Sequence, residues 1–310
     1  MTRIFFATDV HGSEYVFRKF VNALPIYKAD VGILLGDLSG KLVIPIVKNE
    51  DGTFSTTFLG ETKKVKEDEL ENLKKKILIT GYYPVIMTRE ELEEIERKPE
   101  MKDRIFVDNI KKRLEEWIRL AEERLKDKGI RMFIAAGNDD PWEIEEVLNS
   151  SSFVVNAGMK KVYVDEHHEM ITIPYSNPTP WNTPREVSEE ELARIIDDLV
   201  RQIEDMSRAI FNFHVPPYGT ELDLAPKLSK DLIPSVSEMV HVGSKAVLEA
   251  IKRYQPMLGL HGHIHESKGF VKIGRTICLN PGSEYGEGIL KGVIVNLEKD
   301  KVKNYMFVSG

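Results

Sequence analysis

The sequence contains a single cysteine, Cys278, among its 310 residues. One cysteine excludes an intrachain disulfide and any zinc site built from several cysteines. A bound metal would therefore be held by His, Asp, Glu or Asn side chains. The first nine residues are typical of an opening β-strand and not of an export signal. Together with the cysteine count, this pattern predicts a cytoplasmic location.

Long apolar runs and a surplus of basic residues are also missing. No stretch approaches the roughly 18 uninterrupted apolar residues of a membrane span, so no membrane partner is expected. The 43 basic residues are outnumbered by 50 acidic ones, for a net charge of -7, which argues against nucleic acid as the partner. The composition, 42% hydrophobic and 30% charged, is that of a globular protein with a sizeable core.

The first forty residues predict a β-α-β unit. Residues 3–7 and 31–35 are short apolar runs, and between them lies an amphipathic helical pattern that begins after Ser13. Two such strands around one helix predict a parallel pair with a right-handed crossover. Asp9 and Asp37 follow the two strands, and open α/β sheets bind ligands at these carboxyl ends.

Residues 41–128 have a different character and contain none of the motifs that suggest chemistry. They predict a hairpin over residues 42–59 followed by charge-rich helical segments. We interpret them as a hairpin-plus-helices insertion within a single domain spanning residues 1–310. Beyond it, residues 215–240 are predicted to be a long loop that forms a wall of a substrate cleft, and three strands between residues 269 and 297 close the chain.

Metal-capable side chains follow at least five of the predicted strands. One such residue alone is weak evidence, because a lone Asp is more often a helix cap. Parallel strand ends converge, however, so the set predicts one cluster. Its donors exceed the needs of one tetrahedral ion and suit two ions sharing a carboxylate. Mixed nitrogen and oxygen ligation favours Mn, Fe, Zn or Co, and ions roughly 3.5–4 Å apart are a known device for hydrolysing phosphate esters. The predicted metal ligands are Asp9, His11, Asp37, Asn138, His214, His263 and His265.

In their order, these motifs resemble those of the calcineurin-like metallophosphoesterase superfamily. They are D-x-H at residues 9–11, G-D at 36–37, G-N at 137–138, the isolated His214 and G-H-x-H at 262–265. Residues 280–283, N-P-G-S, resemble the family's ending. More narrowly, G-N-D-D-P and H-V-P-P-Y-G-T-x-L-D resemble the Icc-related branch of predicted phosphoesterases. The resemblance implies a four-layer α/β/β/α sandwich with the metal site along one edge.

The resemblance also implies a role for each ligand. Asp9, His11 and His265 would hold one divalent ion, Asp37 would bridge to a second, and the remaining ligands of the second would be Asn138, His214 and His263. The implied activity is dimetal-dependent phosphoester hydrolysis, most simply of a phosphodiester, by in-line attack of a hydroxide between the ions. The expected partner is a small, nucleotide-like phosphoester, and a homo-oligomer is compatible. A nuclease of this fold and a non-catalytic metal-binding scaffold stay open as alternatives.

Two residues are candidates for handling the leaving-group proton. Many members of the family carry a His after the Gly-Asn pair, whereas this sequence has Asp139, and an ionised carboxylate is a poor acid unless burial raises its pKa. His241 stands just before a predicted helix over residues 243–254, whose first amides could attract a phosphate. An ordinary helix-cap loop is the other interpretation of that segment.

Overall fold

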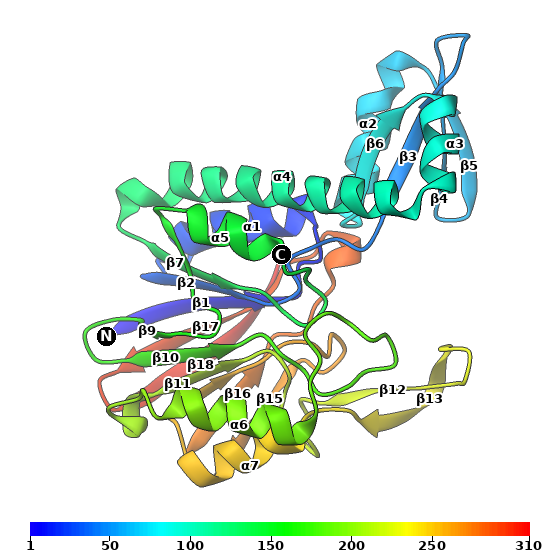
Figure 1. The fold of residues 1–310 in the computed structure, drawn as a ribbon. Helices are drawn as coiled ribbons and strands as arrows, with labels where there is room; N and C mark the ends of the chain where they lie inside the picture. The colour runs from blue at the N-terminus through cyan, green and yellow to red at the C-terminus, as the bar shows by residue number, and fades with distance from the viewer.

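The computed structural model describes residues 1–310, in which two six-stranded sheets face one another (Figure 1). The strand order in the first sheet is β18-β17-β1-β2-β7-β8, and in the second β15-β16-β14-β11-β10-β9. The first sheet contains β1 (Thr2–Thr8), β2 (Val31–Leu35), β7 (Arg131–Ala135), β8 (Val154–Asn156), β17 (Lys291–Glu298) and β18 (Lys301–Ser309). The second contains β9 (Lys161–Tyr163), β10 (Glu169–Ile173), β11 (Ile210–Phe213), β14 (Leu258–Leu260), β15 (Gly269–Ile273) and β16 (Thr276–Asn280).

The alternation of side chains along β1 shows why its sequence is apolar on both faces. Ile4 and Phe6 belong to the core between the two sheets, whereas Phe5 and Ala7 belong to the core between the first sheet and its helices. β1 pairs in parallel with β2 and antiparallel with β17, with Thr2 opposite Leu297. The first strand of the chain is thus completed by one of the last.

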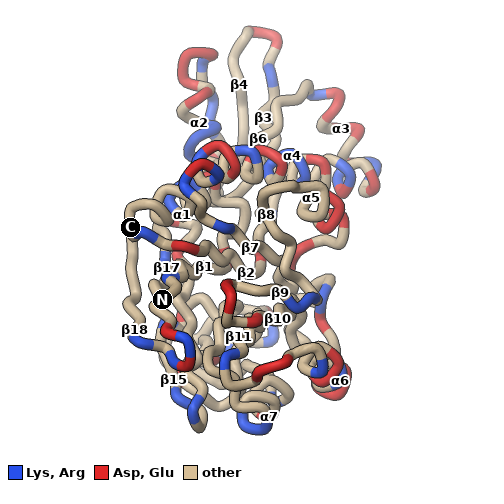
Figure 2. The backbone as a smooth tube through the Cα atoms, turned by 90° about the vertical axis from the view of Figure 1, so that its left-hand side faces the viewer, with Lys and Arg blue, Asp and Glu red and all other residues tan.

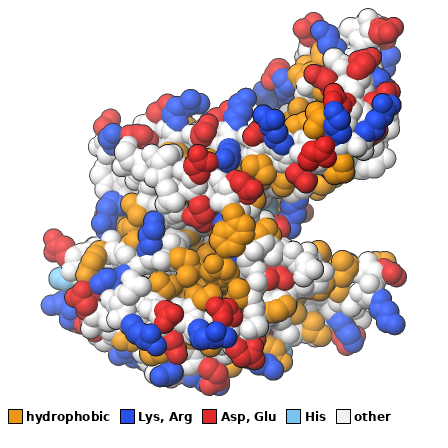
Figure 3. Space-filling view, viewed as in Figure 1, with side chains coloured by type: hydrophobic (Ala, Val, Ile, Leu, Met, Phe, Trp, Pro, Cys, Tyr) orange, Lys and Arg blue, Asp and Glu red, His pale blue; other side chains and the backbone are white.

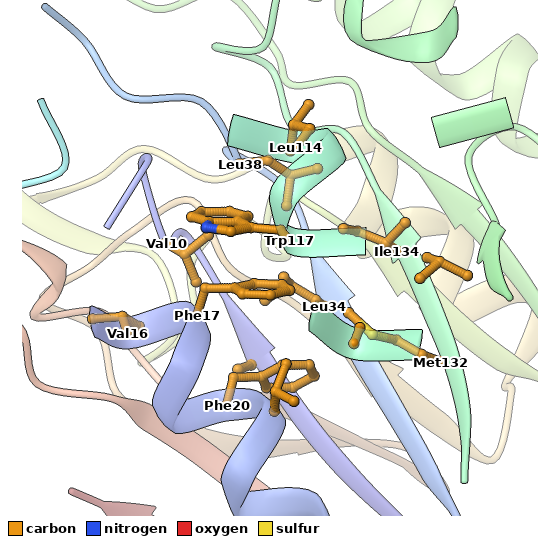
Figure 4. Close-up of a cluster of buried hydrophobic side chains, with 14 of the residues drawn as sticks. Val10, Val16, Phe17, Phe20, Leu34, Leu38, Leu114, Trp117, Met132 and Ile134 are labelled. Atoms are coloured by element: carbon orange, nitrogen blue, oxygen red, sulfur yellow. The ribbon is translucent and has the colours of Figure 1, made fainter. Parts of the chain in front are cut away.

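Helices cover the outer face of each sheet. The first sheet is covered by α1 (Glu14–Ile26), α4 (Pro99–Leu125) and α5 (Ile144–Ser150), and the second by α6 (Glu189–Val200) and α7 (Lys245–Tyr254). In the outer core of the first sheet, the Trp117 ring of α4 stacks on Phe17 of α1 with ring centroids 4.2 Å apart (Figure 4). The predicted α/β fold class is confirmed, and α4 is part of its outer helical layer.

A small sheet with two helices projects from the body and is called the arm here; it spans residues 43–97 (Figure 1). Its sheet has the order β5-β4-β3-β6, and Leu70, Leu73 and Ile77 of α2 pack against it. The predicted hairpin is present as β3 and β4, but β5 and β6 were not predicted. The arm contains β3 (Val43–Lys48), β4 (Phe54–Phe58), β5 (Glu61–Val65), α2 (Glu67–Ile79), β6 (Tyr83–Met87) and α3 (Arg89–Arg97).

Two further expectations need correction. Residues 215–240 are not one loop, because β12 (Leu224–Leu228) and β13 (Pro234–His241) form a hairpin that projects on the same side as the arm (Figure 1). The chain closes with four strands and not three, since β18 follows β17. β18 pairs with β17 alone, and its many exposed side chains weaken the apolar pattern that would have revealed it.

Charges of both signs are interspersed along the chain on the side opposite these projections (Figure 2). None of the helices combines the length and the apolar character that crossing a membrane requires.

Candidate metal centre

The parallel pairing of β1, β2 and β7 brings three sequence motifs to one edge of the first sheet. Leu35 of β2 lies opposite both Thr8 of β1 and Ala135 of β7, so the segments that follow these strands are neighbours. In the second sheet, β11 and β14 are likewise parallel, and His214 and His263 follow them. These strand ends lie on the side from which the arm and the β12–β13 hairpin project, with a hollow between the two projections (Figures 1 and 3).

Two groups of potential ligand atoms form at this edge, each with its atoms within 4.8 Å of one another. The first comprises Asp9, His11 and His265, and the second Asp37, His214 and His263. This is the division that the family resemblance implies. A third group joins His11 and Asp37 to Asp139, so Asp37 lies within reach of both sides, as a bridging ligand must.

The seventh predicted ligand, Asn138, also faces this cluster. Its Oδ1 atom lies 2.9 Å from Nε2 of His214, while its amide nitrogen donates a hydrogen bond to the hydroxyl of Thr183. The hydrogen bond to Thr183 orients the Asn138 oxygen toward the centre. The structure therefore brings all seven predicted ligands together.

The chemistry of these donors fits divalent cations. Nε2 of His11 and Nε2 of His265 lie only 3.2 Å apart. Oδ1 of Asp9 is buried without a hydrogen-bond partner, although an unpaired buried polar atom is costly. Converging imidazole nitrogens and carboxylate oxygens are what Mn, Fe, Zn and Co ions bind.

Four of the seven predicted ligands have a left-handed backbone that non-glycine residues rarely adopt. The φ angles are 53° for Asp9, 40° for His11, 45° for Asp37 and 67° for His263. Each such conformation costs about 1–3 kcal/mol and persists where the surrounding structure enforces it, typically at functional sites. The strained turns therefore identify this sheet edge as a functional site by evidence that does not depend on which side chains are ligands.

The glycines of the motifs have a steric role in the same turns. A Cβ atom on Gly36 would collide with the His214 ring, and one on Gly262 would collide with Thr8 and Asp9. Both glycines let the backbone approach a ligand side chain closely. This explains why glycine precedes the ligand in these motifs.

The buried carboxylates of Asp9 and Asp37 favour positive charge close to them. Burial opposes ionisation of Asp37, but His214 outweighs it and holds the Asp37 pKa well below its usual value. Burial likewise opposes protonation of His214, yet Asp37 and Asp9 raise its pKa to about 9. The site thus favours positive charge at its centre, which suits cation binding.

Asp140 is a buried residue whose importance the sequence analysis missed. Its carboxylate accepts hydrogen bonds from the backbone N–H groups of Leu38 at 3.0 Å, Ser39 at 2.7 Å and Gly137 at 2.8 Å. Burial, followed by the charge of Asp37, raises the Asp140 pKa to about 6. Asp140 ties the turn that carries Asp37 to the turn that carries Asn138.

Arg185 is a second residue that the sequence analysis missed. Its guanidinium group is fully buried and donates to the carbonyl of Asp140 and, at 3.1 Å, to the carboxylate of Glu145. Its backbone N–H donates to the carbonyl of Asn138 at 3.1 Å. Arg185 thus supports the Asn138 turn from a distant part of the chain.

Asp139 lies in the centre, as predicted. Its backbone N–H donates to Oδ1 of Asp37 at 2.9 Å, and its carboxylate lies 3.9 Å from Nδ1 of His11 and 3.3 Å from Nζ of Lys41. Burial and the charge of Asp37 raise its pKa, while Lys41 opposes that shift. The contact with Lys41, which stands two residues before the arm, was not predicted.

His241 is the last residue of β13, and its Nδ1 lies 2.8 Å from Oδ1 of Asp223. It belongs to none of the ligand groups. Of the two interpretations of this segment, the helix cap is confirmed, because Ser244 caps α7, which begins at Lys245. The first two amides of α7 donate to the carboxylate of Glu189 and are not free for a phosphate. A role for His241 in proton transfer stays a prediction that these contacts do not support.

Comparison with known proteins shows which of them resemble this chain. No family model matches the sequence. The crystal structure of TT1561 of Thermus thermophilus aligns with a TM-score of 0.55 at 14% identity, covering 100% of this chain and 98% of that one. The chain therefore shares the fold of that protein, two facing sheets with helices outside. At this identity the likeness concerns the fold alone, so the chemistry of the site rests on its own residues.

Two other proteins are similar over different lengths. A dimetal phosphatase from Danio rerio has a TM-score of 0.48 at 8% identity, covering 99% of this chain and 98% of that one. The uncharacterized protein MJ1162 of Methanocaldococcus jannaschii is 35% identical over 147 residues, 47% of this chain and 61% of that protein. The chain thus matches about three fifths of the length of this relative.

Metal binding is expected to stabilise the folded protein measurably. A ligand at 100 times its dissociation constant adds about 2.7 kcal/mol, so Mn²⁺ or Zn²⁺ should raise the thermal midpoint. His263→Ala should bind less metal and show a smaller rise, whereas His167→Ala, at an exposed turn, should behave as wild type. Differential scanning fluorimetry with metal analysis tests this, and equal rises in all three proteins would contradict it.

Proposed function

We propose that the chain is a dimetal-dependent phosphoester hydrolase, most simply a phosphodiesterase. The observation that carries the proposal is the pair of ligand groups at one sheet edge, with Asp37 within reach of both. When bound, two divalent ions supply Lewis-acid stabilisation of phosphate oxygens and lower the pKa of a water nucleophile. The chain's own residues supply the positioning of the ions, the substrate and the proton.

The charges around the ligands support a diester more than a monoester. Lys41 is the only lysine or arginine that pairs with a residue of the ligand groups, and its partner there is Asp139. Beyond the ions, the centre therefore offers a phosphate a single ammonium group. A diester, with one negative charge, matches this better than a phosphomonoester with two.

A polar pocket beside the centre supports a small substrate. It has a volume of about 460 Å³, is lined by the ligand His265 and by Lys268, Glu284 and Tyr285, and contains one hydrophobic lining residue. A pocket of this size suits a small molecule. Its mixture of charges and hydroxyl groups favours a polar ester group, such as the sugar of a nucleotide, over an apolar one.

The alternatives are distinguished by charge and by the completeness of the donor set. A nuclease would need a basic track for the phosphate backbone, yet acidic residues outnumber basic ones by 50 to 43, and Lys41 alone among lysines and arginines pairs with a residue of the ligand groups. A scaffold that had lost its metals would need no complete set of donors, yet every ligand position retains a metal-binding side chain, so the scaffold alternative is restricted to one that binds metal without turnover.

Metal analysis combined with turnover of bis(p-nitrophenyl) phosphate, with and without Mn²⁺, tests the proposal. We expect bound metal and Mn²⁺-stimulated release of p-nitrophenol. Bound metal with no turnover of any diester, cyclic nucleotide or monoester in a panel would favour the scaffold. A preference for oligonucleotides over mononucleotide esters would favour the nuclease.

Replacing Asp139 with His is expected to accelerate esters with poor leaving groups selectively. An imidazole has a pKa near neutrality and is a better general acid than a carboxyl group, and general acids contribute roughly 10²–10⁴-fold. We expect the ratio of kcat/KM for alkyl to aryl diesters to rise at least several-fold. Asp139→Asn, which has no acid group, is the matched control. A uniform change across leaving groups would show that this position does not transfer a proton.

A further inference from the structure

Lys41 contacts the metal centre, although it was assigned no role from the sequence. Its Nζ lies 3.3 Å from the carboxylate of Asp139, which in turn lies 3.9 Å from the His11 ring. No other lysine or arginine forms an ion pair with a residue of the three ligand groups. Lys41 is therefore the one lysine or arginine side chain that forms an ion pair with a residue of the metal centre.

The backbone beside Lys41 is held firmly against the loop that carries His11. The N–H of Gly40 donates to the hydroxyl of Tyr83 at 2.7 Å, and the hydroxyl of Ser13 donates to the carbonyl of Ile79 at 2.9 Å. A Cβ atom on Gly40 would collide with the carbonyl of Gly81, and one on Gly81 would collide with the carbonyl of His11. Gly81, at the base of the arm, therefore lies in direct contact with both the backbone next to Lys41 and the His11 loop. The base of the arm thus places Lys41 at the centre.

The side chain of Lys41 is nevertheless accessible to a ligand. It is 48% exposed, and Asp139 is its only ion-pair partner. An ammonium group has three N–H donors, so pairing with one carboxylate leaves donors for other acceptors. Phosphate oxygens are strong acceptors for such charge-assisted hydrogen bonds.

We propose that Lys41 binds a non-bridging oxygen of the substrate phosphate at the metal centre, with Asp139 holding the ammonium group in place. The proposal rests on the phosphoesterase function and adds a specificity residue to it. It also gives the arm a part in catalysis, since the arm and its contacts with the His11 loop determine where Lys41 lies. The chemical class recognised is a phosphoryl oxyanion.

The test compares Lys41→Met and Lys41→Arg with Lys48→Met in metal-loaded protein. Lys48 is an exposed lysine at the end of β3, seven residues after Lys41, and makes no ion pair, so it is a matched control. Inorganic phosphate is the binding probe, measured by calorimetry and as an inhibitor of diester turnover. Metal content is determined for every variant.

Lys41→Met is expected to keep its metal and to lose phosphate affinity and kcat/KM by about 10- to 100-fold, the equivalent of a hydrogen bond to a charged group. Lys41→Arg should retain most of both, because it keeps the charge. Lys48→Met should match wild type.

Phosphate binding and turnover by Lys41→Met equal to those of Lys48→Met would overturn the proposal. Its failure is distinguishable from failure of the proposed function. A wild-type protein that turns over no phosphoester, but whose phosphate binding still depends on Lys41, would refute the activity and leave the oxyanion site in place.

Discussion

Asp37→Ala is expected to abolish phosphoesterase activity more completely than His11→Ala. Asp37 belongs to the second ligand group and also lies close to His11 of the first group, so it can reach ions on both sides. His11 belongs to the first group and shares no group with the histidines of the second. Loss of His11 should cost roughly 10²–10³-fold in kcat, the usual effect of removing one transition-state contact. Loss of Asp37 should cost at least about tenfold more, since both ions would then be misplaced.

Metal stoichiometry gives this comparison a second readout. At saturating Mn²⁺, His11→Ala should retain more bound metal per chain than Asp37→Ala. Asp103→Ala, at an exposed position of α4, should resemble wild type in both measurements. Equal residual rates and equal metal content in the two site variants would refute the bridging role of Asp37.

Asp140→Ala is expected to lower the free energy of unfolding by at least about 3 kcal/mol, because each buried donor left unpaired costs about 1–3 kcal/mol. Three backbone N–H groups, those of Leu38, Ser39 and Gly137, donate to this carboxylate. Activity should fall as well, since the turns carrying Asp37 and Asn138 would no longer be held together. Urea unfolding measured alongside kcat tests both effects.

Asp140→Asn is the matched control for this prediction. It keeps the size of the side chain and one carbonyl acceptor, so it should lose less stability than the alanine variant. If the two variants unfold at the same urea concentration, the hydrogen bonds to Asp140 contribute little to the stability of the fold.

The sequence predicted the ligand cluster because its signals are local. Each ligand stands directly after an apolar strand, and parallel strands bring their ends together, so Asp9, Asp37 and His214 could be grouped without coordinates. The α/β fold class followed from the same strand and helix patterns. The order of the motifs along the sequence was enough to predict the cluster, and no tertiary contact had to be known.

The residues that support the cluster could not be predicted in this way. Arg185 and Lys41 act through partners that are distant in sequence, so no local pattern connects them to the cluster. Arginines and lysines are also usually exposed, so the sequence gives no reason to place them at a buried site. β6 pairs in parallel with β3 across α2, a non-local contact without a local signature. The β12–β13 hairpin carries two prolines and many exposed side chains, which favour a loop in any local interpretation.

The pairing of β1 with β17 has a consequence for biosynthesis. Thr2 is made long before its partner Leu297, which follows almost 300 residues later. At 5–20 residues per second, β1 waits roughly 15–60 s for the strand that completes its sheet. His263 and His265 are also made late, so the complete ligand set cannot form on a half-made chain. We therefore expect metal loading to follow synthesis, and the apolar residues of β1 to need protection from aggregation until β17 arrives.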